Sequence, residues 1–115
     1  MHDLLGLIGR SKKLLEQDIE ENRDALDAEV ANSRFLVIGA AGSIGQAVTR
    51  EIFSRSPQAL HAVDINENNL VELVRDLRSS LGYIKGDFRT YALDAGSEEM
   101  ESLMRNEGPY DYVLN

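Results

Sequence analysis

The feature that most constrains this chain is the segment FLVIGAAGSIGQAV, in which a strand-like run leads directly into a helical pattern. The apolar run RFLVIG is typical of a strand that is buried on both faces. Gly39, Gly42 and Gly45 then follow at three-residue spacing, and SIGQAVTREIFSR continues with apolar residues at helical intervals. A strand, a glycine turn and a helix in this order predict the first unit of a dinucleotide-binding domain.

The rest of the chain repeats this alternation. We expect further strands at ALHAVDI, DFRTYALD and YDYVLN, and further helices at NENNLVELVRDLRSSL and SEEMESLMRNE, with Asn66 and Ser97 as helix N-caps. The predicted buried face of the first helix consists of Ile44, Ala47, Val48 and Ile52. Short connections predict parallel strands with right-handed crossovers. The expected fold class is therefore α/β: a Rossmann-type doubly wound parallel sheet, partial, with about four strands in the order 3-2-1-4.

Residues 1–33 differ in character from residues 34–115. The first range is charge-rich and is predicted to be an N-terminal helical segment, either a surface helix of its own domain or a docking helix for another subunit or domain. Its apolar face consists of Leu15, Ile19, Leu26 and Val30. The second range is predicted to be the N-terminal part of a dinucleotide-binding Rossmann domain. Because such domains usually have about six strands, we expect the chain to be part of a larger protein.

Composition excludes several function classes. The formal net charge of −8 repels phosphate backbones, so no nucleic-acid partner is expected. The sequence has no cysteine, which excludes disulfides and thiol catalysis within it and fits the cytoplasmic location that we expect. No apolar run approaches the roughly 20 residues that span a bilayer. His2 and His61 have no metal-ligand spacing, and His61 is interpreted as a core or edge residue of a strand.

Each glycine of the turn has a physical task in a phosphate site. Gly39 lets the chain turn sharply, Gly42 lets the backbone approach a pyrophosphate, and Gly45 lets the helix pack closely on the strand. The free N–H groups and the positive dipole end of the helix then point at the anion. The alternative is a purely structural turn. The predicted cofactor-binding residues of the turn are Gly39, Ala41, Gly42, Ser43, Ile44 and Gly45.

Asp64 ends the second predicted strand, about 20 residues after the third glycine. A carboxylate there accepts hydrogen bonds from the ribose diol of NAD and repels the 2′-phosphate of NADP. The stretch INENN has no Lys or Arg to receive such a phosphate, so NAD is the expected cofactor and NADP is disfavoured. Ile65 and Asn66 belong to the same predicted site. The alternative for Asp64 is a loop acid or a helix cap.

Two further strand ends supply candidates. Asp94 and Ala95 follow the third predicted strand, where a carboxylate can accept from the adenine amino group, and the alternative is a solvated loop acid. Asn115 ends the fourth predicted strand, beside the glycine turn, and is expected to contact the cofactor or to be a frayed end. Asp87 and Arg89 are assigned no role.

The glycine turn together with Asp64 resembles the extended short-chain dehydrogenase/reductase superfamily, whose pattern is G-x-x-G-x-x-G. Within it, the chain is most similar to the capsular-polysaccharide-biosynthesis branch of nucleotide-sugar dehydratases and epimerases. That branch has a GAxGSIG turn, an acid followed by a stretch like NENNL, and an LxGR segment like LIGR. The chain departs from it at Asn115, where many members have histidine, and at VIGA in place of VTGA.

The resemblance implies the NAD(H)-binding portion of an enzyme acting on a UDP-sugar in polysaccharide biosynthesis. In such enzymes the nicotinamide takes a hydride from the sugar, and a tyrosine in a Tyr-x-x-x-Lys pair acts as base. The tyrosines of this sequence, none with a lysine four positions on, are Tyr83, Tyr91, Tyr110 and Tyr112. We therefore expect the catalytic and sugar-binding segments to lie beyond Asn115, and this chain alone to be inactive.

Two other functions stay open on the sequence: a small regulatory module that senses NAD(H), and a nucleotide-free scaffold. The G-x-x-G-x-x-G spacing favours the enzyme portion over the regulatory module. An open edge on the fourth strand, or the N-terminal helix, also predicts self-association into a homo-oligomer.

Overall fold

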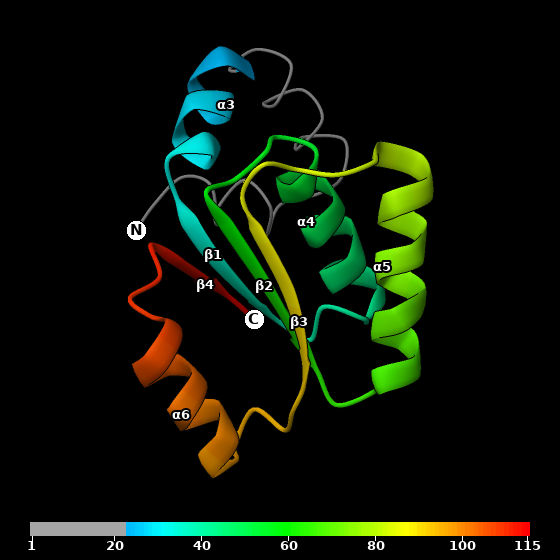
Figure 1. Ribbon diagram of the computed structural model, residues 1–115, viewed down its shortest axis with the longest axis vertical. Coiled ribbons are helices and arrows are strands. Elements are labelled where there is room, and N and C mark those ends of the chain that lie inside the picture. Colours follow the sequence, from blue (N-terminus) through cyan, green and yellow to red (C-terminus); the bar gives the residue numbers. More distant parts are fainter. Residues whose placement is uncertain (1–22) are drawn as a thin grey trace.

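The computed structural model describes residues 23–115 as a four-stranded sheet with helices on both faces (Figure 1). In chain order the elements are α3 (Arg23–Ala31), β1 (Arg34–Ile38), α4 (Ser43–Phe53), β2 (Ala59–Asp64), α5 (Glu67–Leu81), β3 (Asp87–Ala92), α6 (Glu98–Glu107) and β4 (Tyr112–Leu114). All strand pairs are parallel, and the spatial order is β3-β2-β1-β4. The predicted fold class and strand order are therefore confirmed.

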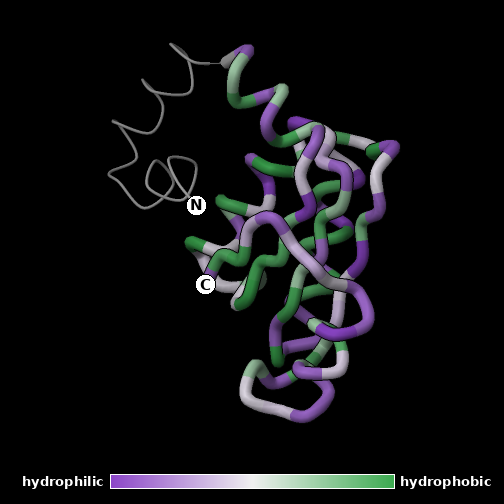
Figure 2. The backbone as a smooth tube through the Cα atoms, turned by 90° about the vertical axis from the view of Figure 1, so that its left-hand side faces the viewer, coloured by the Kyte–Doolittle hydropathy of each residue, from purple (hydrophilic) through white to green (hydrophobic). Residues whose placement is uncertain are grey.

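Side chains of the strands alternate between two apolar layers. Phe35, Val37 and Leu60 belong to the layer that α4 and α5 cover, whereas Leu36 and Val63 belong to the layer that α6 covers. The two central strands β1 and β2 are thus buried on both faces, as the continuous apolar runs of the sequence predict. The hydropathy colouring in Figure 2 accordingly places hydrophobic stretches in the middle of the molecule.

The helix α3 packs against the sheet rather than standing apart from it. Leu26 and Val30 are 8% and 0% exposed and join the core layer that contains Phe35. Leu15 and Ile19, the other two members of the predicted apolar face, lie outside the described residues.

The strand β4 is only three residues long, and aromatic contacts anchor it. The Tyr112 ring stacks on the Phe35 ring of β1, with centroids 5.0 Å apart and planes 13° apart. Its hydroxyl donates a hydrogen bond to Glu29 Oε2 of α3 at 2.6 Å. The strand at this edge of the sheet is therefore tied both to its neighbour and to a helix far away in the sequence.

The two predicted helix caps are confirmed. The Asn66 side chain accepts from the N–H of Asn69 at 2.9 Å, and the Ser97 hydroxyl accepts from the N–H of Met100 at 3.2 Å. Each bond satisfies one of the N–H groups that the first turn of a helix leaves without a partner.

The predicted buried face of α4 is confirmed for Val48 and Ile52 and wrong for Ile44 and Ala47. Ile44 is 78% exposed and Ala47 is also exposed. Thr49 and Phe53 are buried beside Val48 and Ile52. The reason is that Gly45 packs against Gly39 and Ala40 of the turn, where a Cβ would lie 2.0 Å from the Gly39 carbonyl oxygen, and the neighbouring Ile44 then faces outward. The Thr49 hydroxyl is accommodated in the core because it donates to the Gly45 carbonyl at 2.7 Å.

The third strand ends two residues earlier than predicted, at Ala92 instead of Asp94. The N–H of Leu93 still donates to the Asp64 carbonyl at 3.1 Å, but Asp94 then turns the chain. Its Oδ1 accepts from the N–H of Gly96 at 3.0 Å, which is the local bond that ends strands and starts turns. Asp94 therefore lies in the loop before α6.

Polar side chains near the amino ends of the strands bind one another, in a set that we call the amino-end network. Its members are His61, Asp87, Arg89, Glu107 and Tyr110. The buried His61 lies within β2, and its Nδ1 and Nε2 are 2.7 Å from the Tyr110 hydroxyl and 2.8 Å from Asp87 Oδ2. His61 is thus a core residue, one of the two positions predicted for it, and the network links β2, β3 and the segment before β4.

The pKa shifts of Tyr110 and Asp87 agree with the hydrogen bonds of the amino-end network. Burial raises the pKa of Tyr110 to about 12, so its hydroxyl keeps the proton that it can donate to His61. Burial alone would raise the pKa of Asp87, but hydrogen bonds from His61 and Arg89 outweigh it and lower that pKa below its ordinary value. Asp87 is therefore the ionised acceptor, and the imidazole carries its proton on Nε2 when neutral.

Candidate functional site

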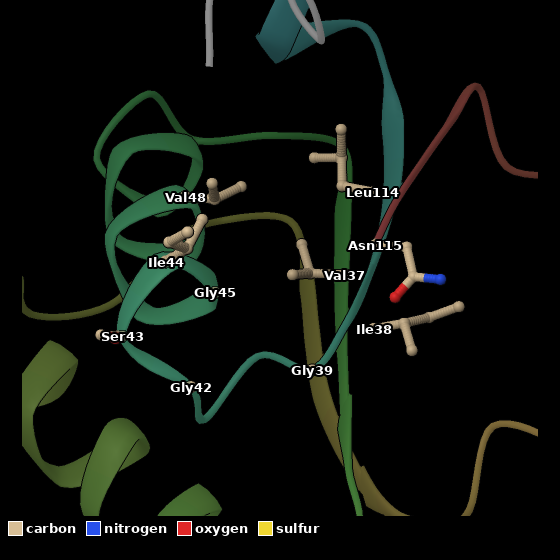
Figure 3. A pocket seen from close by; sticks show the side chains of 10 residues that line it. All are labelled: Val37, Ile38, Gly39, Gly42, Ser43, Ile44, Gly45, Val48, Leu114 and Asn115. Atoms are coloured by element: carbon tan, nitrogen blue, oxygen red, sulfur yellow. The ribbon is translucent and has the colours of Figure 1, made fainter. Parts of the chain in front are cut away.

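The carboxyl ends of the strands meet at one edge of the sheet, where two clefts open. The α4 cleft has a volume of about 480 Å³ and lies between α4 and the ends of β1 and β4 (Figure 3). The β2 cleft, of about 220 Å³, lies between the ends of β1 and β2 and the loop after β3. The two clefts share Ile38 and Gly39, so they adjoin each other at the end of β1, and we refer to them together as the groove. In doubly wound sheets this edge is where ligands bind.

The structure brings most of the predicted site residues to this groove. Those that line the α4 cleft are Gly39, Gly42, Ser43, Ile44, Gly45 and Asn115. Those that line the β2 cleft are Gly39, Asp64, Ile65, Asp94 and Ala95. Two predicted residues line neither cleft: Ala41 is 7% exposed, and the side chain of Asn66 caps α5.

Gly39 gives the chain its sharp turn at the end of β1. Its φ of +76° lies in the left-handed region that favours glycine. The N–H groups of Gly39 and Ala40 both donate to the Val63 carbonyl of β2, at 2.8 and 3.1 Å, and the N–H of Gly42 donates back to the Gly39 carbonyl at 3.1 Å. The turn is thus pinned to the end of β2 and closed on itself.

The other two glycines of the turn differ in what the fold requires of them. A Cβ on Gly45 would lie 2.0 Å from the Gly39 carbonyl oxygen, so only glycine lets α4 approach the turn this closely. A Cβ on Gly42 would meet only that same oxygen, at 3.4 Å, and its φ of −73° and ψ of 167° suit any residue. The folded chain has room for a Cβ at Gly42, so packing at that atom does not require a glycine there.

The amino end of α4 presents unpaired donors to the α4 cleft. Gly42 is the N-cap and offers no side-chain acceptor, and the first turn has no acidic residue. The N–H of Gln46 is the first in the helix that reaches a backbone acceptor, the Gly42 carbonyl at 2.8 Å. The three preceding N–H groups, from Ser43 to Gly45, have no acceptor in the described part of the chain. An anion placed there meets three donors and the positive end of the helix dipole.

The carboxylate of Asp64 links the glycine turn to the start of α5. Oδ2 accepts from the N–H of Ala41 at 3.0 Å, and Oδ1 accepts from the N–H of Asn66 at 2.9 Å. A carboxylate offers about four lone-pair positions, so each oxygen can accept one further bond from a ligand. The side chain thus holds the glycine turn and also faces the β2 cleft.

Three apolar residues of the α4 cleft were expected only in the core. Val37, Val48 and Leu114 form much of its wall, and Figure 3 shows them converging on the space above Gly39 and Gly45. Periodicity could not find them, because a residue lining the end of a parallel sheet has the same spacing as one buried in its middle. The wall suits a flat apolar ring better than a hydrated ion.

Sequence reasoning also missed Gln46. Its side-chain amide donates to the Ala41 carbonyl at 2.7 Å, from the first turn of α4 back to the glycine turn. The glutamine occupies an exposed helix position with no motif of its own, so no sequence signal marks it.

The charge of the groove is carried by Asp64 and Asp94, and no Lys or Arg lines either cleft. Any anion is therefore held by backbone N–H groups and the helix dipole alone. Within residues 23–115, no cluster of His, Asp and Glu could hold a metal ion. In the same range, no helix is long and apolar enough to cross a membrane.

Comparison with known proteins agrees with this geometry. Residues 35–111, which contain the glycine turn, Asp64 and Asp94, match the family described as polysaccharide biosynthesis protein. That family lies in the extended short-chain dehydrogenase/reductase superfamily, in agreement with the resemblance noted in the sequence. No curated protein matches the chain. The family match spans well over half of the sequence, and the chain therefore belongs to the polysaccharide biosynthesis protein family.

Proposed function

We propose that this chain is the NAD(H)-binding portion of a nucleotide-sugar dehydratase, epimerase or oxidoreductase of polysaccharide biosynthesis. The family of the chain supports a role in polysaccharide biosynthesis. The groove at the ends of β1 and β2 supports the assignment of NAD(H) as the cofactor. NAD, when bound, accepts a hydride from the sugar, while the protein orients the cofactor and surrounds it with apolar walls.

The observation that carries the proposal is the glycine at position 42. Neither its backbone conformation nor its packing requires glycine, yet a side chain there would stand at the mouth of the α4 cleft, in front of the free N–H groups of α4. A pyrophosphate needs this space, because its oxygens must approach the backbone to about 3 Å. A bound pyrophosphate would therefore account for a glycine at position 42.

The β2 cleft supports the adenosine end of the same ligand. Asp64 has lone pairs left for the two ribose hydroxyls, and Ile65, Asp94 and Ala95 surround the adjoining space. The 2′-phosphate of NADP would meet the carboxylate of Asp64 with no Lys or Arg in the cleft to offset the repulsion. NAD is therefore the proposed cofactor. Asn115 and Leu114 then lie on the nicotinamide side, in the α4 cleft.

We also propose that this chain does not act on the sugar by itself. None of its four tyrosines is followed by a lysine four positions on, so the sequence lacks the pair that supplies the base in related enzymes. Incubation with NAD and UDP-glucose or UDP-N-acetylglucosamine, followed by NADH absorbance, is expected to show no turnover. Sustained NADH formation would contradict this part of the proposal.

Calorimetric titration with NAD, NADH and NADP tests the cofactor assignment. We expect NAD to bind at least about 10-fold more tightly than NADP. Gly42→Val should abolish NAD binding, because its side chain blocks the pyrophosphate. Asp64→Ala should weaken the binding of NAD and remove the preference for NAD over NADP. Ala47→Val, on the exposed face of the same helix, is the matched control and should bind NAD like the wild type.

Two outcomes would overturn the assignment. Unchanged NAD binding by Gly42→Val would show that the pyrophosphate lies elsewhere. Tighter binding of NADP than of NAD by the wild type would remove the role given to Asp64.

A further inference from the structure

The peptide group between Ala41 and Gly42 is held from both sides. Its carbonyl accepts from the Gln46 side chain at 2.7 Å, and its N–H, which belongs to Gly42, donates to the Gly39 carbonyl at 3.1 Å. The preceding N–H, that of Ala41, donates to Asp64 Oδ2 at 3.0 Å. Hydrogen bonds therefore run without a break from the first turn of α4, through the glycine turn, to the end of β2.

The direction of the Ala41 carbonyl matters for an anion. This peptide immediately precedes the free N–H groups of α4, so a rotated carbonyl would present a negative dipole end beside them. The Gln46 amide bonds this carbonyl, and neither Gln46 nor Ala41 is among the residues that line the α4 cleft. Of the side chains on α4, that of Gln46 is the one that donates to the residues between β1 and α4, since Thr49 donates to Gly45 within the helix itself.

We propose that Gln46 is a positioning residue of the pyrophosphate site, whose amide fixes the Ala41–Gly42 peptide so that its carbonyl points away from the bound anion. This inference rests on the proposed function, because it concerns the same site. It assigns Gln46 no contact with the cofactor. The residue acts through the backbone and lowers the reorganisation needed when the pyrophosphate binds.

The test compares ADP, which has a pyrophosphate, with adenosine, which has none. Gln46→Met keeps the length of the side chain but cannot donate, and Gln46→Glu places a carboxylate against the Ala41 carbonyl. We expect ADP affinity to fall about 3- to 10-fold in the first variant and about 10-fold or more in the second. Adenosine affinity should stay within about 2-fold of the wild type in both, because Asp64 and the β2 cleft are unchanged.

A matched control is Gln58→Met. Gln58 is an exposed glutamine at the amino end of β2, its side chain makes no hydrogen bond within residues 23–115, and the substitution should leave both affinities unchanged. Amide hydrogen exchange without ligand gives an independent measurement. The Gly42 amide should exchange faster in Gln46→Met than in the wild type, since the peptide that it belongs to is no longer held on its carbonyl side.

The outcomes separate the two proposals. If the wild type binds ADP and Gln46→Glu binds it equally well, the positioning role is wrong and the proposed function stands. Parallel loss of ADP and adenosine affinity would also overturn the positioning role, because it indicates general disruption. If the wild type binds neither ADP nor NAD, the proposed function fails, and the positioning role fails with it.

Discussion

The two ends of the sheet satisfy their polar groups in opposite ways. At the amino ends of the strands, His61, Asp87 and Tyr110 bind one another within the chain, and no buried side-chain polar atom of the described residues lacks a partner. At the carboxyl ends, the first N–H groups of α4 face the α4 cleft without an acceptor. At the amino ends, side chains satisfy one another's hydrogen bonds. At the carboxyl ends, backbone N–H groups are left without an acceptor.

The difference separates polar groups that are satisfied within the fold from polar groups that stay available to a ligand. A buried polar group that has found its partner stabilises the native state and has nothing left to offer a ligand. A helix terminus without a cap forgoes part of that stability and keeps its donors for an external anion. Substitutions at the amino end should therefore change stability alone, and those at the turn should change binding.

The largest effect on stability is expected at His61. In His61→Leu both hydrogen bonds of the imidazole are lost, and we expect the free energy of unfolding to fall by about 2–3 kcal/mol. Urea denaturation followed by circular dichroism measures it. Tyr110→Phe, which removes only one of the bonds, should cost about 1 kcal/mol. Both variants should keep wild-type NAD affinity, and a loss of affinity without a loss of stability would break the comparison.

A smaller effect, with a defined pH dependence, is expected at Asp87. Because hydrogen bonds from His61 and Arg89 lower its pKa in the folded state, the carboxylate stabilises the fold above its ordinary pKa of 3.8. That contribution is lost as the pH falls through the lowered folded pKa. Asp87→Asn should therefore cost about 1 kcal/mol at pH 7, a modest amount since solvent screens a side chain that is 40% exposed.

Urea denaturation at pH 7 and near pH 3 tests the Asp87 prediction. The difference in unfolding free energy between the wild type and Asp87→Asn should shrink at the lower pH. A difference that stays constant or grows would show that the carboxylate does not act as the ionised acceptor of the amino-end network.

The smallest effect on stability is expected at Gly42. Gly42→Ala should lower the free energy of unfolding by only about 0.5 kcal/mol, because the added Cβ meets only the Gly39 carbonyl oxygen, at 3.4 Å, and alanine caps a helix somewhat less well than glycine. Gly45→Ala is the matched contrast and should cost about 2 kcal/mol or more, since its Cβ would strike the Gly39 carbonyl. The same denaturation measurement distinguishes them. Equal costs for the two substitutions would mean that the fold, and not a ligand, requires Gly42.

Much of the fold was predictable because its signals are local. The apolar run before Gly39 and the caps at Asn66 and Ser97 each act within a few residues, and the alternation of strands and helices leaves few ways to order the sheet. The face of α4 was not predictable in the same way. The closeness of Gly45 to the Gly39 carbonyl sets it, and helical periodicity alone cannot tell a packed glycine from an exposed one.

Of the candidate site, the turn and Asp64 could be found because spacing reveals them, whereas the contacts among them could not. Asp64 reaches Ala41 across 23 residues, and His61 reaches Tyr110 across 49. Such pairs exist only once parallel strands have come together in register. The Gln46 side chain bonds a residue only five positions away. That bond still depends on the backbone conformation of the turn, which cannot be predicted from the residue types alone.

The bond between Tyr112 and Glu29 ties the order of synthesis to the order of folding. On the ribosome α3 and β1 emerge well before β4, since 83 residues separate the two partners of that bond. Until Tyr112 arrives, the Phe35 ring lacks its stacking partner, and this edge of β1 stays open. The growing chain therefore passes through a stage with an unpaired apolar strand edge, a kind of species prone to aggregation. Leu114 arrives with the same strand, so the nascent chain completes the α4 cleft only when this edge closes.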